Sequence, residues 1–158
     1  VGNPIGGGIA SFSSRGPRYD GVMKPDIAAP GVSIASAISS FTDSQFSSVG
    51  SIEFNNKTYH FARLSGTSMA SPMVAGVAAL ILDAHPTIAA SEVKNILLQT
   101  AREDNKTGIL PAVGDPTWGH GKVNALAAVQ QAVILNDIEQ IHAKEEIQIY
   151  PNQLLLKN

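Results

Sequence analysis

Ser68 is the residue of this chain whose neighbours best suit covalent chemistry. A serine hydroxyl attacks a carbonyl only when it is exposed, oriented and close to a base. Ser68 follows Gly66 and precedes a run, residues 69–84, that is almost entirely apolar. Pro72 is tolerated in the first turn of a helix, so we expect a helix to begin near Ser68. The unpaired N–H groups and positive dipole of that helix end would suit the oxyanion of an acyl transfer.

The same residues also fit a purely structural role. Ser68 could cap the helix and Gly66 could serve an ordinary turn, and local spacing alone favours this interpretation. A different enzyme class, the α/β-hydrolases, places its serine in a nucleophile elbow that needs Gly two residues later. This chain has Ala70 there, and no Asp-then-His order downstream supports that class.

Composition sets limits on the remaining functions. The 158 residues (16.5 kDa) are enough for one domain with a core. Eleven Lys and Arg against 13 Asp and Glu give a formal charge of −2, which leaves no basic stripe for nucleic acid. No uninterrupted apolar run approaches 18 residues, so we expect no membrane span. The absence of Cys excludes disulfides, thiolate metal sites and a cysteine nucleophile.

The elements that position Ser68 follow from turn and helix signals. In chain order we expect a strand entering a Gly-rich loop (1–17), an irregular connection (18–31), a strand (32–38), a Ser-rich loop (39–51), a hairpin around Asn55-Asn56 (52–64), and helices that begin near Ser68, at the N-cap Ser91 and at Val123. The first helix ends at Pro86, and the third is expected to end near Leu135.

Two features of the first helix predict how it packs. Its apolar residues leave no polar face, and a helix that is apolar all round is buried on all sides. Gly76 in its interior costs about 1 kcal/mol relative to Ala, which indicates a close backbone approach. Near the other end of the chain, residues 147–150 precede Pro151 and predict an extended linker or edge strand.

Several segments together resemble the subtilisin-like serine proteases, or subtilases. The segment GTSMASP at 66–72, followed by VAG at 74–76, is similar to the active-serine signature of that family. The flanking segments FSSRGP (12–17), KPDIAAPGV (24–32) and WGHGKVN (118–124) resemble family segments in the same order. The resemblance runs from about residue 1 to about 133, and Met73 stands where subtilases usually have His.

The resemblance implies a fold and a reaction. The fold would be α/β, a three-layer subtilisin-like fold with a mostly parallel sheet, present only as its C-terminal portion. Residues 1–135 would be that part of the catalytic domain, and 136–158 a linker or the start of a C-terminal domain. As a serine endopeptidase acting on peptides or proteins, the chain would use Ser68 to form the acyl-enzyme. Thr67 and Gly66 would support the oxyanion and substrate.

Two further positions gain roles from the resemblance. Met69 would be an oxidation-sensitive residue lining the site. Residues 12–15 would lie near the substrate-binding cleft.

The triad partners of that family are missing before Ser68. Subtilases carry Asp, then His, then Ser, with a separate oxyanion Asn, and none of the earlier motifs occurs here. We expect the histidines, at positions 60, 85, 120 and 142, to be surface or capping residues, and Asp26 to be structural. The chain opens on Val1 without a visible signal peptide, so we expect a fragment whose missing N-terminal half carries the base.

A fragment of this kind should be inactive on its own. It should also expose part of the Ser68 helix and an unpaired sheet edge. The alternative function is a non-catalytic pseudoprotease or interaction module that keeps the subtilase fold.

Cofactor and location expectations come from the same resemblance. No acidic cluster supplies the six to eight oxygen ligands of Ca²⁺, so we expect no cofactor or metal in this chain and structural calcium only in the parent protein. The family indicates an extracellular or cell-surface location. Residues 147–152 also resemble the opening of C-terminal sorting domains of the Bacteroidetes type IX secretion system. The triplets that begin at Asn56 and Asn105 fit the N-glycosylation pattern.

Overall fold

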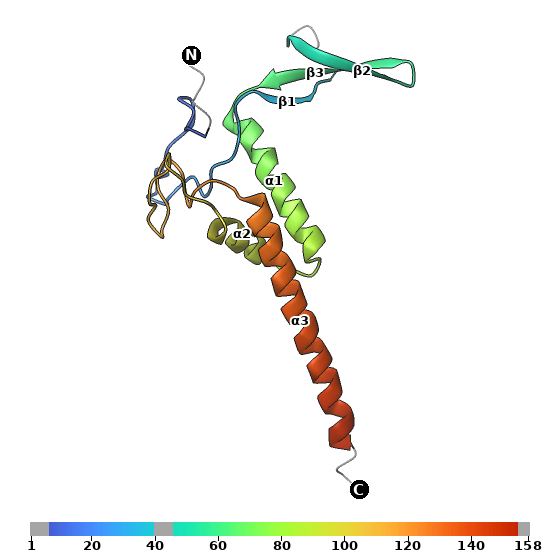
Figure 1. Ribbon diagram of the computed structural model, residues 1–158. Helices are drawn as coiled ribbons and strands as arrows, with labels where there is room; N and C mark the ends of the chain where they lie inside the picture. Colours follow the sequence, from blue (N-terminus) through green and yellow to red (C-terminus); the bar gives the residue numbers. More distant parts are fainter. Residues whose placement is uncertain (1–6, 40–45, 155–158) are drawn as a thin grey trace.

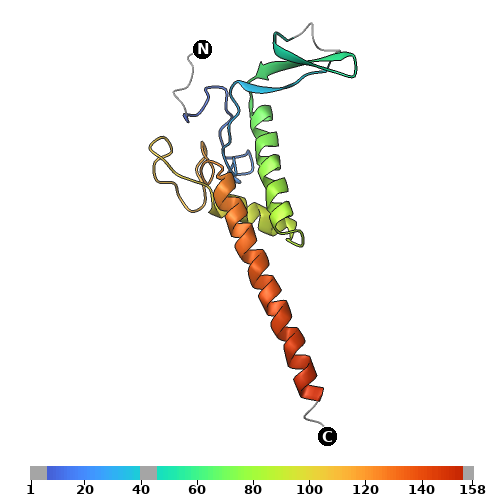
Figure 2. The same cartoon turned by 45° about the vertical axis from the view of Figure 1, so that its right-hand side comes forward.

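The computed structural model describes the backbone of residues 7–39 and 46–154 and the side chains of these ranges up to residue 143. Its elements are β1 (Ile34–Ala37), β2 (Ser48–Phe54), β3 (Lys57–Leu64), α1 (Thr67–Ala84), α2 (Ala90–Gln99) and α3 (Ala125–Leu154). Figure 1 shows the strands projecting sideways from the N-terminal end of α1, while α3 extends far beyond the other helices. Figure 2 shows the same arrangement after a turn of the molecule.

The three strands form one antiparallel sheet in the order β1-β3-β2. The predicted hairpin is confirmed, because Asn55 (φ 49°) and Asn56 (φ 57°) supply the two positive φ angles of a type I′ turn. The strand expected over 32–38 is confirmed as β1. β2 begins at Ser48, so its first residues occupy part of the stretch predicted as a loop.

Two expectations fall partly outside the described residues. Positions 40–45 of the Ser-rich loop and positions 1–6 of the first expected strand are among those not described. Over residues 7–17, which are described, the backbone forms turns and irregular structure rather than a strand.

α1 begins one residue before Ser68, with Gly66 as its N-cap, and ends at the C-cap His85 before Pro86. The predicted helix is therefore confirmed, but Pro72 lies in its second turn rather than its first. Proline has no N–H, so the Ser68 carbonyl receives no hydrogen bond from position 72.

α2 begins at Ala90, and its N-cap is Ala89 rather than the predicted Ser91. The carbonyl of Ala89 accepts hydrogen bonds from the N–H groups of Glu92 (2.9 Å) and Val93 (3.1 Å), which closes the first turn ahead of Ser91. The serine side chain therefore makes no capping bond, and the helix starts without one.

The core lies where the three helices meet. It consists of buried residues from each helix, namely Val77, Ile81, Val93, Ile96, Leu97, Ala128 and Ala132. Partly buried apolar residues that include Ile27 and Val123 pack around it. The small side chains that α3 contributes let that helix approach α1 closely.

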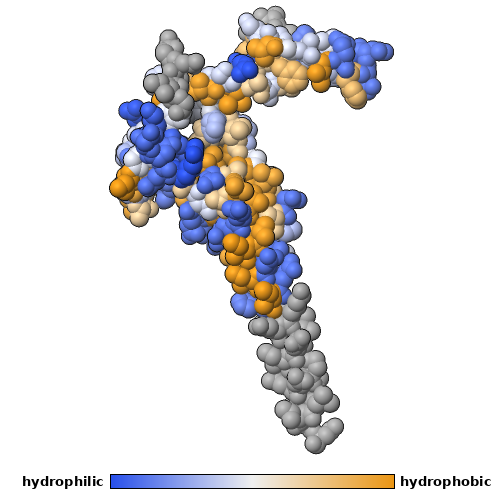
Figure 3. Space-filling view, viewed as in Figure 1, coloured by the Kyte–Doolittle hydropathy of each residue, from blue (hydrophilic) through white to orange (hydrophobic). Residues whose placement is uncertain are grey.

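The opposite face of α1 is open to solvent. Met73 (43%), Leu80 (52%) and Leu82 (45%) are exposed, and in Figure 3 apolar residues gather over the middle of the molecule, between more hydrophilic regions. A methyl group at Gly76 would meet nothing within 4 Å. Within this chain the prediction of burial on all sides is therefore wrong, whereas the prediction that the chain alone exposes part of this helix is confirmed.

The length and composition of α1 would also allow it to cross a membrane. Its mean hydropathy is 1.4 over 18 residues, and 11% of that stretch is buried. The core helix of a soluble protein passes the same test, so length and composition do not by themselves assign a membrane span. The expectation of no membrane span was based on uninterrupted apolar runs, and α1 is interrupted by Ser71, Pro72, Gly76 and Asp83.

α3 continues well past its predicted end near Leu135. Its second half contains Glu, Gln, Ala and Lys, all good helix formers, which extend the helix beyond the core. The backbone of residues 147–150 is helical, so the extended segment predicted there is not formed.

Candidate active site

Ser68 is the second residue of α1 and is exposed. Within the described residues, the N–H groups of Thr67 and Ser68 donate to no acceptor. Gly66 provides no side-chain cap, and the first turn contains no acidic residue. The hydroxyl of Ser68 therefore lies beside two free donors at the positive end of a helix, an arrangement that attracts a developing negative charge.

Backbone contacts hold the loop before Ser68 in place. The N–H of Gly66 donates to the carbonyl of Gly31 (2.8 Å), and the N–H of Met69 donates to the carbonyl of Gly66 (3.0 Å). The N–H of Ser33 donates to Oγ of Ser65 (2.8 Å). These bonds tie the loop before Ser68 to the segment that leads into β1.

Gly31 is a site residue that the sequence analysis did not single out. A Cβ atom at this position would lie 2.7 Å from the Gly66 carbonyl oxygen and 3.1 Å from Cβ of Ala70. The first distance is shorter than real Cβ contacts, so only glycine lets these backbones meet. The Pro30-Gly31 pair, inside the irregular connection predicted over 18–31, was the available signal.

A cavity of about 730 Å³ lies next to this loop. Gly66 and Thr67 form part of its wall, together with Phe12, Ser13 and Ser14. The N-terminal segment expected near the substrate cleft therefore lies beside the same cavity as Thr67. Ser68 itself is outside the cavity wall, directly after Thr67 in the chain.

A buried lysine secures the far side of the cavity. Lys122, 9% exposed, places Nζ 2.6 Å from Oδ2 of Asp104 and 4.9 Å from the centre of the Trp118 ring. Asp104 also accepts hydrogen bonds from the N–H groups of Lys106 and Thr107. The Lys122 bond and these backbone bonds lower the pKa of Asp104 to about 2.

No histidine in the described part of the chain is hydrogen-bonded to Ser68. His60 lies on β3, and Nδ1 of His120 is 3.2 Å from the Asp26 carbonyl oxygen. His85 caps the far end of α1, roughly 25 Å away at the helical rise per residue. Ser68 therefore has no general base among these residues.

Asp26 is engaged by lysines rather than by a histidine. Its carboxylate forms ion pairs with Lys24 and, at 3.1 Å, with Lys94. Partial burial acts to raise the pKa of Asp26, but the hydrogen bonds from Lys24 and Lys94 outweigh it and hold the pKa below its ordinary value. This arrangement suits the structural role expected for Asp26.

The described residues contain no group of three or more His, Asp or Glu side chains that could hold a metal ion. Asp26, which lies between the cavity-lining residues Pro25 and Ile27, and Asp104, which is bonded to Lys122, each form ion pairs with lysines. The side chains of this part of the chain therefore form no acidic cluster that would indicate a calcium site.

Comparison with known proteins decides the family. The sequence profile of the subtilase family matches residues 4–121. The chain belongs to the subtilase family. Subtilisin-like protease SBT4.9 of Arabidopsis thaliana is 38% identical over 128 residues, a match that covers 80% of this chain and 17% of that protein. SBT3.7 of the same plant is 36% identical over 144 residues, covering 85% of this chain and 17% of that protein.

Solved structures of proteases are also similar to this chain. A protease from Pseudoalteromonas arctica PAMC 21717 is 34% identical, with a TM-score of 0.44, over 68% of this chain and 29% of that chain.

Family membership confirms the α/β subtilisin-like fold class, of which this chain is a portion. The strands described here are antiparallel, and the parallel contact among the isolated bridges joins Ala28 to Lys122. The chain spans about a sixth of the length of the curated subtilases it matches, 17% for those named.

Proposed function

We propose that this chain supplies the nucleophile of a serine endopeptidase, with Ser68 forming the acyl-enzyme. One observation carries the proposal. Ser68 is exposed on the first turn of α1, and within the described residues its own N–H group and that of Thr67 have no acceptor. Membership of the subtilase family supports a protease of the serine type.

The reaction would proceed by acyl transfer. Oγ of Ser68 attacks the carbonyl carbon of a peptide bond and passes its proton to a histidine. The resulting oxyanion accepts a hydrogen bond from the Ser68 N–H, with Thr67 and Gly66 shaping the space around it. The C–N bond then breaks, the amine leaves with the proton from the histidine, and water hydrolyses the ester on Ser68.

The histidine and its aspartate would lie outside this chain, in the N-terminal half of the same catalytic domain. That half would cover the exposed face of α1, where Met73, Leu80 and Leu82 now meet solvent. The substrates would be peptides or proteins, and the location extracellular or at the cell surface. Structural calcium, if the parent protein holds it, would be bound by residues outside the described part of this chain.

A fluorophosphonate probe tests the proposal directly, because it reacts only with an activated serine. In the full-length protein we expect labelling of the tryptic peptide that contains Ser68. Ser68→Ala should abolish labelling, and the control Ser71→Ala, one turn further along α1, should retain it. No labelling of a correctly folded full-length protein would refute the endopeptidase and favour a pseudoprotease.

A further inference from the structure

The three strands form an arm, residues 34–37 and 48–64, that stands apart from the helices. In Figures 1 and 2 it projects from the end of α1 that carries Ser68. β3 has eight residues, so the hairpin turn lies roughly 24 Å from the end of β3 that joins the nucleophile loop. The arm therefore reaches well beyond any residue at the scissile bond.

Strand pairing sorts the side chains of the arm into two faces. Alternate residues of β3 share one face, and Ile52 and Phe54 of β2 stand opposite Tyr59 and Lys57. We call this the cationic–apolar face; it consists of Ile52, Phe54, Lys57, Tyr59, Phe61 and Arg63. Glu53 points to the other face, where its carboxylate accepts a hydrogen bond from Thr58.

The cationic–apolar face is open, and neither of its charges pairs with a carboxylate among residues 7–39 and 46–143. Phe54 is 62%, Ile52 55% and Tyr59 42% exposed. Neither Lys57 nor Arg63 forms an ion pair with a described residue, and Arg63 reaches only the Ser33 carbonyl, at 3.5 Å. In the space-filling view the arm carries apolar patches with hydrophilic residues at its outer end (Figure 3).

The arrangement of charge indicates what would bind there. Lys57 and Arg63 are six residues apart on one strand, roughly 20 Å, with aromatic and aliphatic side chains between them. No carboxylate of the described strands belongs to this face. The ligand that complements this face is an extended polypeptide of about seven residues. It has apolar side chains in the middle, which contact the apolar side chains of the face, and carboxylates at both ends, which pair with Lys57 and Arg63.

We propose that the cationic–apolar face binds an acidic–apolar segment of the substrate polypeptide, remote from the bond that is cleaved. β3 leads through Ser65 and Gly66 directly to α1, and Ser33 at the base of β1 is hydrogen-bonded to Ser65. A segment bound on the arm is therefore held at a fixed reach from Ser68. That the bound segment belongs to a substrate rests on the proposed function of Ser68. The binding of such a segment to the arm does not depend on that function.

A peptide-binding experiment tests the arm separately from the proposed catalytic role of Ser68. Full-length protein carrying Ser68→Ala is titrated with a fluorescent extended peptide whose apolar centre is flanked by Glu, and with the same peptide flanked by Lys. We expect the Glu peptide to bind more tightly. Lys57→Glu should weaken its binding about fivefold and strengthen that of the Lys peptide, because reversing one exposed charge changes an ion pair by roughly 1 kcal/mol.

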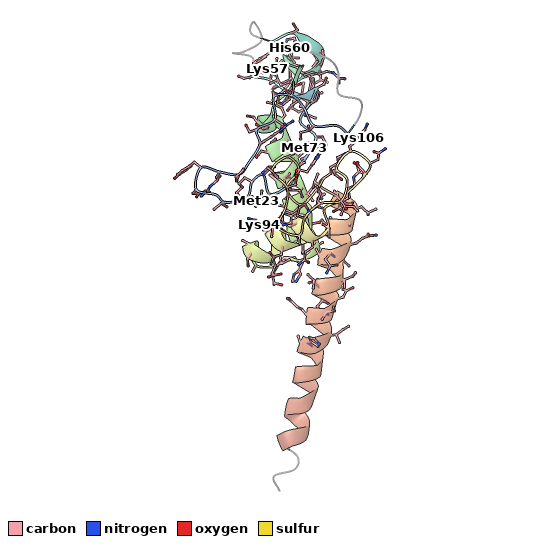
Figure 4. All side chains as sticks on the ribbon, turned by 90° about the vertical axis from the view of Figure 1, so that its left-hand side faces the viewer. Met23, Lys57, His60, Met73, Lys94 and Lys106 are labelled. Atoms are coloured by element: carbon pink, nitrogen blue, oxygen red, sulfur yellow. The ribbon has the colours of Figure 1, made fainter. Side chains whose placement is uncertain are left out.

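The chain offers matched controls. Lys106 is an exposed lysine on a separate loop (Figure 4), so Lys106→Glu changes the net charge equally and should leave both affinities unchanged. Tyr59→Ser should weaken binding of either peptide, whereas Thr58→Ala, on the opposite face, should not.

Three results would overturn the inference. Lys57→Glu and Lys106→Glu could bind the Glu peptide equally. Lys57→Glu could lower the melting temperature instead of the affinity, which would mean that this face packs on the rest of the protein. It could also dissociate a dimer, which would assign the face to a second copy. Normal charge-dependent binding with no Ser68-dependent hydrolysis would support the arm and refute only the endopeptidase.

Discussion

Individual side chains near the site owe their properties to neighbouring backbone N–H groups and lysines. Asp104 combines the two, since its carboxylate accepts hydrogen bonds from Lys122 and from the N–H groups of Lys106 and Thr107. Its pKa of about 2 lies below the ordinary value near 4. The bonds therefore stabilise the folded state only while the carboxylate is ionised.

The pH dependence of stability follows from this shift. Between about pH 4 and pH 2 the unfolded chain binds a proton at Asp104 that the folded chain does not, so stability falls as the pH is lowered through this window. Urea midpoints of the chain, followed by Trp118, its only tryptophan, should decline with acid. In Asp104→Asn that part of the decline should be absent. Parallel curves for the two proteins would contradict the assignment.

At the scale of helices and strands, the boundaries that could be predicted are those set by residues at the boundary itself. The hairpin was predictable because Asn55 and Asn56 adopt the positive φ angles of the turn themselves. The start of α1 was predictable to one residue because Gly66 and Pro72 bracket it. The prediction that Ser91 caps α2 was wrong because the helix already begins with hydrogen bonds to the Ala89 carbonyl. Where the helix begins depends on how α2 packs on the core, which the sequence around Ser91 does not show.

Contacts between distant segments were beyond the sequence. The close approach of Gly31 to Gly66 and Ala70, and the ion pair of Lys122 with Asp104, join residues 18 or more positions apart. The segment GTSMASP pointed to Ser68, but no local pattern shows which backbones must touch around it. The length of α3 was missed because its second half lacks a core to bury against, and only its helix-forming composition signals it.

A substitution at Gly76 reports whether the open face of α1 is covered in the full-length protein. On a solvent-exposed helix, Gly76→Ala should raise the free energy of unfolding by about 1 kcal/mol. If the N-terminal half packs on this face, the added methyl group should instead lower it by roughly 1–3 kcal/mol. We expect the second sign in calorimetry or denaturant unfolding of the full-length protein.

A control isolates the propensity effect for that measurement. Ala143→Gly, on the exposed part of α3, should cost about 1 kcal/mol whichever way α1 is packed. A stabilising Gly76→Ala in the full-length protein would show that the face is free.

At the scale of the whole molecule, the chain is a core of three helices with an apolar surface left open. Leu80, Leu82 and Met73 on α1, and Ile134, Ile138 and Ile141 on α3, all meet solvent. Exposed apolar side chains that gather on one surface are typical of a face that another protein segment covers. We therefore expect further protein to cover this surface.

The isolated chain should behave accordingly. We expect it to bind the dye ANS, to associate as its concentration rises, and to hydrolyse no peptide through Ser68. Leu80→Glu, at a position 52% exposed, should reduce both dye binding and association without lowering helix content by circular dichroism. Turnover of a fluorogenic peptide that Ser68→Ala abolishes would contradict the fragment interpretation.

Pro72 loosens the connection between the turn that carries Ser68 and the rest of α1. Because Pro72 has no N–H, the turn that carries Ser68 lacks one of the hydrogen bonds that would otherwise join it to the rest of α1. Bonds from Met69 and Ala70 to the Gly66 carbonyl, at 3.0 and 3.4 Å, hold its start. The first turn is therefore held less firmly than the helix that follows it, which Val77 and Ile81 anchor in the core.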